Sequence, residues 1–257
     1  MKDTRFCIMD DGIRLHARLA APDGATGVVI IFHGFTGHME ERQLVSVAQA
    51  LNGMGLATLR VDLYGHGESD GRFRDHTLFK WMSNALAVID HARSLDFAKD
   101  IYLCGHSQGG LLAMLAAAME RDIVKGLILL APAAMIPDNC RSGELADARF
   151  DPEHIPDSVR CWDTELGGNY FRVAQTIRVD DAIRRYDGPV LVVHGDADEA
   201  VPVQVGIDTA GGYRQGELVR IPEAGHCFVR HLDLAVEAVK AWMARHAAAS
   251  EQRGIPG

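Results

Sequence analysis

The sequence feature that most constrains the fold is YLCGHSQGGLLAMLAA, at residues 102–117. Apolar residues typical of a buried strand lead into Gly-His-Ser-Gln-Gly-Gly, and an Ala-rich apolar stretch typical of a buried helix follows. Ser107 therefore stands between Gly105 and Gly109 where a strand turns into a helix. A turn this sharp leaves no room for side chains at the two glycine positions. The segment predicts a strand–turn–helix unit whose serine hydroxyl projects alone.

Elsewhere the chain alternates β-rich runs with helical patterns. Residues 27–32 form a continuous apolar run, as expected for a strand buried on both faces. Strands that alternate with helices predict an α/β fold, in which helices cover both faces of a mostly parallel, doubly wound sheet. The predicted strands are residues 5–9, 13–20, 27–32, 57–61, 100–104, 124–130, 189–194 and 217–221, and the predicted helices are residues 40–52, 78–94, 108–119, 203–210 and 232–246.

The alternation stops at residues 133–186, which contain scattered prolines, two adjacent glycines and several aromatic residues. A stretch of this length is too long for a loop inside a compact domain. We therefore predict an α/β core made of residues 1–132 and 187–257, and an inserted cap, or lid subdomain, made of residues 133–186.

Charge, cysteine content and motifs exclude several classes of protein. The net charge is −9 and the sequence has no basic run, which argues against a nucleic-acid partner. The five cysteines are far apart and include no CxxC pair, so neither a disulfide framework nor a zinc site is indicated. GxxxxGK[ST], HExxH and a GxGxxG after a strand do not occur, and we expect no metal and no cofactor.

Targeting signals are also missing from the sequence. No stretch reaches about 18 consecutive apolar residues, so we expect no membrane span. The N-terminal MKDTRFCIMDDG lacks the apolar run of a signal peptide. Reduced thiols are the simpler interpretation of the five cysteines, and we therefore expect a cytoplasmic protein.

Ser107 has the chemistry of a nucleophile, but a serine hydroxyl reacts poorly without a base. His226 follows the last predicted strand, where its ring can reach over the serine. The segment HGDADEAVP, after the preceding strand, offers Asp196, Asp198 and Glu199 as the acid that orients this histidine. We favour Asp198 because it lies further from the strand, which leaves Asp196 to shape the turn. The predicted catalytic triad is Ser107, Asp198 and His226.

A reaction at an ester carbonyl also needs an oxyanion hole made of two backbone N–H groups. The N–H of Gln108, directly after the nucleophile, is one predicted donor. The loop FHGFTGH, after an early strand, supplies the second, and Phe35 is the natural candidate within it. The positive N-terminal end of the helix that follows Ser107 favours the developing charge.

These motifs together resemble the α/β-hydrolase superfamily over nearly the whole chain. The resemblance is most specific to bacterial cinnamoyl or feruloyl esterases, through the segments HGFTGH, GHSQGG, LLAPAA, FDPEHIPD, LGGNYFRVAQ and GHCF. It implies a serine esterase that binds hydroxycinnamate esters under an inserted α/β cap. It assigns the triad to Ser107, Asp198 and His226 and the oxyanion hole to Phe35 and Gln108. The loop DLYGHGESDG looks like the one after the fourth strand of these enzymes, and we interpret it as structural support.

In the cap, the resemblance implies substrate-binding residues. Tyr170, in the LGGNY motif, matches the tyrosine that meets the phenolic end of the substrate. A one-residue slip leaves open whether Asp138 or Asn139 matches a second polar contact. The glutamine expected within residues 144–149 is missing, which leaves the choice among hydroxylated cinnamates open. Trp162 can either stack on an aromatic ring of the substrate or pack within the cap.

We therefore expect a feruloyl, caffeoyl or coumaroyl esterase that acts on a small-molecule ester through an acyl-enzyme intermediate. The alternatives are a generic short-chain carboxylesterase, a monoacylglycerol lipase-like enzyme, a C–C bond hydrolase and a hydrolase fold that binds a ligand without catalysis. The leaving alcohol stays open among methanol, quinate and arabinose, and so does the oligomeric state, including a homodimer. Scattered histidines such as His16, His76, His91 and His154 are expected on the surface.

Overall fold

The computed structural model describes residues 1–253. Its centre is an eight-stranded sheet in the order β1-β2-β4-β3-β5-β6-β11-β12. The pairs β1–β2 and β2–β4 are antiparallel and the remaining neighbours are parallel, which confirms the predicted α/β fold. The strands are β1 (Lys2–Asp10), β2 (Ile13–Ala21), β3 (Gly27–Phe32), β4 (Ala57–Val61), β5 (Asp100–His106), β6 (Val124–Leu130), β11 (Val190–Gly195) and β12 (Gly216–Ile221).

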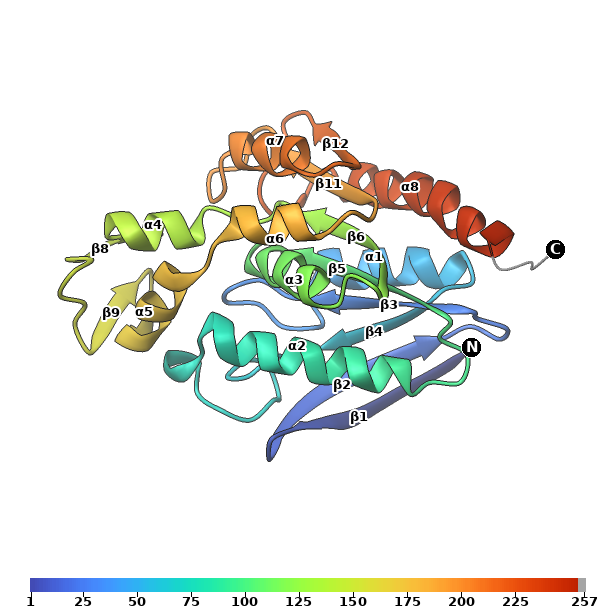
Figure 1. Ribbon diagram of the computed structural model, residues 1–257, viewed down its shortest axis with the longest axis horizontal. Coiled ribbons are helices and arrows are strands. Elements are labelled where there is room, and N and C mark those ends of the chain that lie inside the picture. The colour runs from blue at the N-terminus through green and yellow to red at the C-terminus, as the bar shows by residue number, and fades with distance from the viewer. Residues whose placement is uncertain (254–257) are drawn as a thin grey trace.

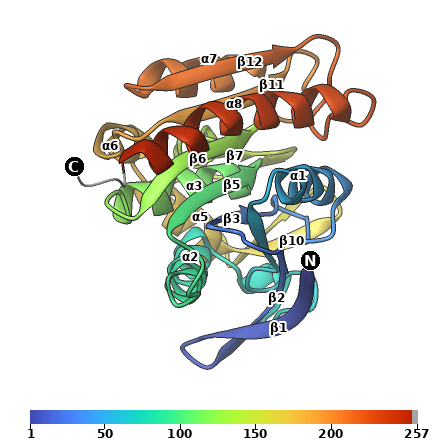
Figure 2. The ribbon, with the colours of Figure 1, turned by 90° about the vertical axis from the view of Figure 1, so that its right-hand side faces the viewer.

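Helices cover both faces of this sheet (Figures 1 and 2). In β3, Val28 and Ile30 belong to the apolar cluster under α2 and α3, whereas Val29 and Ile31 belong to the cluster under α1 and α8. Successive side chains of a strand point to opposite faces, so a strand that is covered on both sides is apolar throughout. The covering helices are α1 (Arg42–Gly53), α2 (Leu78–Arg93), α3 (Gln108–Met119), α7 (Val203–Gly212) and α8 (Leu232–Arg253).

The strand β1 is longer than the sequence pattern predicts. It pairs with β2 from Lys2 to Asp10, whereas the pattern predicts residues 5–9 alone. As the edge strand of the sheet it is mostly exposed or half-buried, so its ends carry no apolar signal. Pairing with β2 extends it beyond the predicted range.

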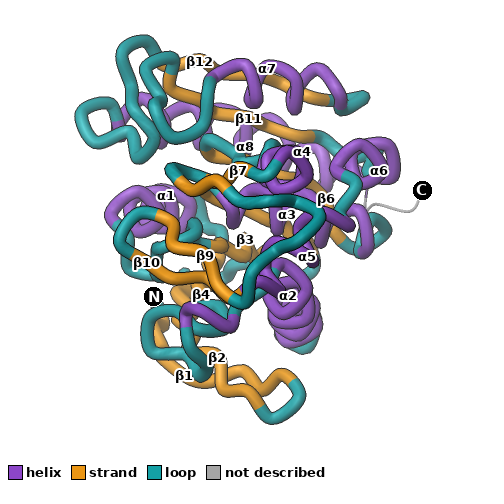
Figure 3. Tube along the Cα trace, turned by 90° about the vertical axis from the view of Figure 1, so that its left-hand side faces the viewer, coloured by secondary structure: helices purple, strands orange, loops and turns teal. Residues whose placement is uncertain are grey.

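The segment between β6 and β11 contains small elements that lie together beyond the ends of the sheet strands (Figures 1 and 3). Two short antiparallel ribbons pair β7 with β8 and β9 with β10. A third apolar cluster, which includes Cys140, Leu166, Tyr170 and Phe171, holds the segment together. Its elements are α4 (Ile136–Ser142), β7 (Glu144–Leu145), β8 (Ala148–Arg149), β9 (Ser158–Cys161), β10 (Thr164–Gly167), α5 (Gly168–Thr176) and α6 (Val179–Arg185).

The last helix of this segment, α6, packs mainly against the core of the protein. The helix α6 packs against α3 and α7 of the core, although it lies within the range that we predict for the cap. The boundaries of the cap as a domain stay a prediction. None of the helices in the described part of the chain is both long and apolar enough to cross a lipid bilayer.

Candidate active site

Ser107 occupies the turn between β5 and α3, as the sequence predicts. Its backbone has φ +55° and ψ −122°, a strained conformation for a residue with a side chain. A Cβ at Gly105 would strike the backbone of Gly109, and a Cβ at Gly109 would strike the carbonyl groups of Phe32 and His33. The turn therefore requires glycine at both positions. The Ser107 carbonyl accepts hydrogen bonds from the N–H groups of Gly110, Leu111 and Ala133 and so anchors the turn.

The histidine and the acid predicted from the sequence meet at the carboxyl ends of the neighbouring strands. Nδ1 of His226 donates a hydrogen bond to Oδ2 of Asp198 at 2.8 Å. The other oxygen of Asp198 accepts the N–H groups of Ala200 and Val201, each at 2.9 Å. His194 Nε2 lies 3.3 Å from Oδ2 of the same carboxylate. The Asp198 side chain is fully buried, and three hydrogen bonds together with the nearby His194 ring hold it in one orientation.

These partners decide the protonation state of the acid. Burial favours neutral Asp198, but the hydrogen bonds from His194 and His226 outweigh it and hold the pKa of Asp198 well below its usual range. Asp198 is therefore an anion at neutral pH. The anion fixes the His226 tautomer with the proton on Nδ1, which leaves Nε2 free to accept a proton.

Asp196 has a different role, although it lies only two positions away. Its Oδ1 accepts the N–H of Glu223 at 2.7 Å, and Arg220 lies 3.9 Å from its Oδ2. This carboxylate ties the loop after β11 to the loop that carries His226. The structure brings Asp198, and not Asp196, to the histidine.

A second histidine supports the backbone of His226. Nε2 of His106 donates to the carbonyl oxygen of His226 at 3.0 Å, and Gln43 Nε2 lies 3.5 Å from Nδ1 of His106. Burial, together with nearby His226, lowers the pKa of His106 to about 3, so this ring is neutral. Sequence reasoning missed His106 as a support, and its only signal was a polar residue at the end of a buried strand.

The predicted oxyanion donors lie at two fixed backbone segments. Gln108 is the first residue of α3, where N–H groups have no acceptor within the helix. The loop that carries Phe35 is held by the segment DLYGHGESDG: His66 Nε2 donates to the carbonyl oxygen of Phe35 at 2.6 Å, and Asp62 accepts the N–H of Met39 at 2.7 Å. This segment has the supporting position that the sequence predicts.

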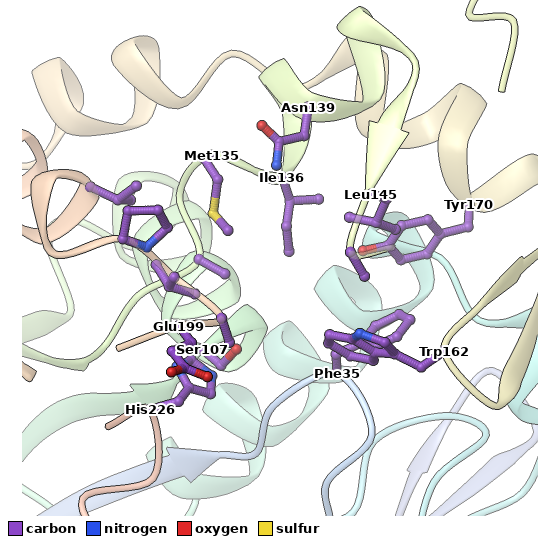
Figure 4. A pocket seen from close by; sticks show the side chains of 16 residues that line it. Phe35, Ser107, Met135, Ile136, Asn139, Leu145, Trp162, Tyr170, Glu199 and His226 are labelled. Atoms are coloured by element: carbon purple, nitrogen blue, oxygen red, sulfur yellow. The ribbon is translucent and has the colours of Figure 1, made fainter. Parts of the chain in front are cut away.

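A cavity of about 460 Å³ opens above Ser107 (Figure 4). Ser107 and His226 lie on one side of it, and aromatic side chains form the opposite wall. Its lining is mostly apolar and comes from both the core and the segment between β6 and β11. The lining residues are Phe35, Ser107, Ala133, Met135, Ile136, Asn139, Leu145, Ala146, Trp162, Tyr170, Glu199, Ala200, Val201, Pro202, Val205 and His226.

The chain is similar to known proteins in sequence and in structure. Residues 23–158, more than half of the chain, match the model of the family described as serine aminopeptidase, S33. The chain belongs to this family. Among solved structures, Est1E from Butyrivibrio proteoclasticus with bound ferulic acid is 56% identical, with a TM-score of 0.93, over 95% of this chain and 99% of that one. These matches confirm the α/β-hydrolase fold and the resemblance to bacterial feruloyl esterases.

Curated relatives are more distant. A dihydrolipoyllysine-residue acetyltransferase component of an acetoin cleaving system from Pseudomonas putida is 28% identical over 79% of this chain. The human palmitoyl-protein thioesterase ABHD10 is 32% identical over 43% of this chain. The chain spans 59% of the length of the first and 35% of the length of the second. The names of these two relatives describe different reactions, so they do not indicate one substrate.

Within this α/β-hydrolase, the cap residues predicted from the sequence lie at different depths. Asn139 lines the cavity, whereas Asp138 points away from it, with a side chain 78% exposed that accepts a hydrogen bond from Arg141. Of the two positions that the sequence left open, Asn139 lines the cavity and Asp138 does not, and contact of either with a substrate stays a prediction. The reason for the difference is helical geometry, because consecutive residues of α4 point in different directions.

Tyr170 and Trp162 form the aromatic wall with Phe35. Tyr170 is fully buried, and its hydroxyl donates to Oε1 of Gln108 at 2.6 Å. Burial raises the pKa of Tyr170 well above its ordinary value, so the hydroxyl keeps its proton. Trp162 is 48% exposed at the tip of the β9–β10 ribbon, and its ring meets that of Phe35 edge-on at 5.9 Å. Trp162 therefore faces the cavity rather than the cap interior.

The prediction that His76 lies on the surface is wrong. The residue is fully buried and packs among the rings of Phe35, Trp81 and Tyr170. Burial lowers its pKa to about 3. Its position in a loop gives no periodic signal, which is why the sequence does not reveal its burial. No group of three or more His, Cys, Asp or Glu side chains within residues 1–253 is arranged to hold a metal ion.

Proposed function

We propose that this protein hydrolyses carboxylic esters through an acyl-enzyme intermediate on Ser107. The observation that carries the proposal is the shared cavity of Ser107 and His226, together with the 2.8 Å hydrogen bond from His226 to the buried Asp198 carboxylate. Nucleophile, base and orienting acid come from the ends of three parallel strands, which is where α/β proteins bind ligands. The family match and the likeness to Est1E support the same reaction class.

The proposed reaction has two similar halves. Nε2 of His226 takes the Ser107 proton while the serine oxygen attacks the ester carbonyl, and the imidazolium is stabilised by Asp198. The N–H groups of Phe35 and Gln108 receive the oxyanion. His226 then protonates the leaving alcohol, and the acyl group stays on Ser107. Water attacks this acyl-enzyme with His226 as base and releases the acid.

For the acyl group we propose a hydroxycinnamate. The walls formed by Phe35, Trp162 and Tyr170 suit a flat aromatic acid, and Est1E, at 56% identity, has been solved with ferulic acid bound. The Tyr170 hydroxyl already donates its proton to Gln108, so its oxygen can only accept from a substrate. A phenolic substrate would thus donate its O–H to Tyr170, and the Asn139 amide also lines the cavity.

We also propose that residues 133–186 act as the cap of the site. Eight of the residues that line the cavity come from this range, including Asn139, Trp162 and Tyr170. Because the triad and the oxyanion hole come from the core, exchange of the cap should change the preferred ester while the chemistry is retained. A cap of this kind determines specificity rather than reaction type.

A hydrolysis screen tests the proposed function. The substrates are methyl ferulate, methyl cinnamate, p-nitrophenyl butyrate and a long-chain acyl ester, each measured with the wild type and with Ser107→Ala. We expect the highest kcat/KM for methyl ferulate, and no turnover of any ester by the variant. Preference for the long-chain ester would instead support a lipase or thioesterase-like activity, and preference for the butyrate a generic carboxylesterase. Hydrolysis of none of them by the wild type would contradict the proposal.

A further inference from the structure

The wall of the cavity contains one carboxylate. Among its lining residues in the described part of the chain, Glu199 is the only acidic side chain and no Lys or Arg is present. Glu199 is exposed and directly follows Asp198, which holds His226. Its carboxylate has no cation and no hydrogen-bond partner among the described residues. The charge of Glu199 is therefore uncompensated by a direct contact and is open to the cavity.

The place of Glu199 relative to a bound ester follows from the mechanism, so this inference rests on the proposed function. His226 protonates the leaving alcohol, which has to lie on the His226 side of the serine oxygen. Figure 4 shows Glu199 on the same side of the cavity as Ser107 and His226, with Phe35, Trp162 and Tyr170 across from it. An acyl group against the aromatic wall leaves the alcohol on the side of Glu199.

We propose that Glu199 is a specificity-determining residue that disfavours esters whose leaving alcohol carries a negative charge. Like charges about 7 Å apart in a half-open, hydrated site repel enough to change a rate about three- to tenfold. Neutral alcohols experience no such repulsion. Of the three alcohols compatible with the sequence, methanol and a neutral sugar such as arabinose are favoured, and quinate, which has a free carboxylate, is disfavoured.

A pair of esters with the same acyl group isolates this effect. Methyl caffeate and chlorogenate, the caffeoyl ester of quinate, form the same acyl-enzyme and differ in the charge of the alcohol. Glu199→Gln removes the charge and keeps the size of the side chain. We expect kcat/KM for chlorogenate to rise about three- to tenfold, with less than about a twofold change for methyl caffeate. Any effect of the substitution on His226 itself acts on both esters. The ratio of kcat/KM for chlorogenate to kcat/KM for methyl caffeate therefore reports the effect of the charge on the leaving alcohol.

Two controls separate a local charge from the net charge of the protein. Glu223→Gln removes an exposed carboxylate that lies outside the cavity, and it should leave the ratio unchanged. Salt should narrow the gap between the two esters in the wild type, because the screening length falls from about 30 Å at 0.01 M to about 3 Å at 1 M. The same salt change should have a smaller effect on the ratio in Glu199→Gln.

A second pair of esters keeps the test independent of the acyl group. 4-Acetoxybenzoate and its methyl ester share the acetyl group and differ in the charge on the leaving phenol, and release of acetate is followed for both. The comparison between the wild type and Glu199→Gln cancels the difference in leaving-group reactivity. Hydrolysis of at least one pair with an unchanged ratio in Glu199→Gln would overturn the role of Glu199 alone. Hydrolysis of neither pair by the wild type would contradict the proposed function and, with it, this inference.

Discussion

Asp196 and Asp198 are identical in residue type and lie in one loop, yet their partners give them different roles. Asp198 accepts three hydrogen bonds and faces His226, whereas Asp196 accepts one backbone N–H from the neighbouring loop. His226 is similarly held at two points, by Asp198 through its ring and by His106 through its carbonyl oxygen. Substitutions that remove these partners one at a time separate the roles of the individual residues.

Asp198→Asn should lower kcat about 10⁴-fold, because an amide cannot hold the imidazole with its proton on Nδ1 or stabilise the imidazolium. Asp196→Asn should change kcat by less than about tenfold, because its carboxylate binds backbone and not the histidine. Steady-state kinetics of the two variants on one ester provide the comparison. Equal losses, or a larger loss for Asp196→Asn, would reverse the assignment of the acid.

His106→Leu should lower kcat about 10- to 100-fold with little change in KM, because the His226 carbonyl loses its donor and the ring shifts relative to Asp198. His106→Gln should recover much of this loss, since its amide N–H can occupy the place of Nε2. Loss of the low-field NMR signal of the Nδ1 proton on His226 in His106→Leu, and its return in His106→Gln, would identify positioning as the cause. Equal activity of the two variants would contradict it.

Much of the site was predictable from the sequence, because its motifs are local. Ser107 is marked by its flanking glycines, and His226 and Asp198 by their place directly after strands. The geometry agrees with these three predictions, while their catalytic roles remain proposals. His106 was not identified, because it acts on a residue 120 positions away. Glu199 was named only as a candidate for the acid of the triad, because its place in the wall of the cavity depends on the fold.

At the scale of secondary-structure elements, the hydrogen bond from Tyr170 in α5 to Gln108 in α3 joins the segment between β6 and β11 to the helix after the nucleophile. The long elements were predictable, since β3 is apolar throughout, β5 has a continuous apolar run at residues 101–104 and α2 has a regular apolar face. The ribbons β7–β8 and β9–β10 were not, because strands of two to four residues are too short to show alternation.

Tyr170→Phe tests this link. Loss of the hydroxyl leaves the buried Gln108 amide without its donor, so the free energy of unfolding should fall by about 1–3 kcal/mol. In the active site, the loss of kcat/KM should be about fivefold or more greater for methyl ferulate than for methyl cinnamate. Only methyl ferulate has a phenolic O–H, and this group loses its acceptor when the Tyr170 hydroxyl is removed. Urea unfolding and kinetics on the two esters measure the two effects separately. Equal losses on both esters would restrict Tyr170 to a structural role.

At the scale of the whole molecule, buried histidines make the fold sensitive to acid. Burial lowers the pKa of His76 and of His106 to about 3, and burial also holds the pKa of His33 well below its ordinary value. These rings stay neutral in the folded protein but gain a proton in the unfolded chain below about pH 6.5. The stability is therefore fully present above about pH 6.5 and declines as the pH falls below it. The pH range of this loss lies above the range in which protonation of Asp198 affects stability. Because the pKa of Asp198 is lowered in the folded protein, its contribution to stability is lost only below about pH 4.

Each of these histidines should lower the free energy of unfolding by up to about 1.4 kcal/mol per pH unit below pH 6.5. Urea unfolding between pH 8 and pH 5 should therefore show a steep loss in the lower half of this range. His76→Phe keeps an aromatic ring at this position. It should reduce the dependence of the free energy of unfolding on pH by up to about 1.4 kcal/mol per pH unit, the contribution of one histidine. A stability that is constant from pH 8 to pH 5, or a slope unchanged in the variant, would be inconsistent with buried neutral rings.

The most direct test of the central proposal is to identify the residue that becomes acylated. Methyl ferulate is mixed with the wild type, the reaction is quenched in acid before steady state is reached, and digested protein is analysed by mass spectrometry. We predict one feruloyl group on the peptide that contains Ser107, no adduct in Ser107→Ala, and a loss of kcat in that variant of about 10⁴-fold or more. A feruloyl group on another residue, or a Ser107→Ala variant that retains more than about a few per cent of the wild-type kcat, would contradict the account.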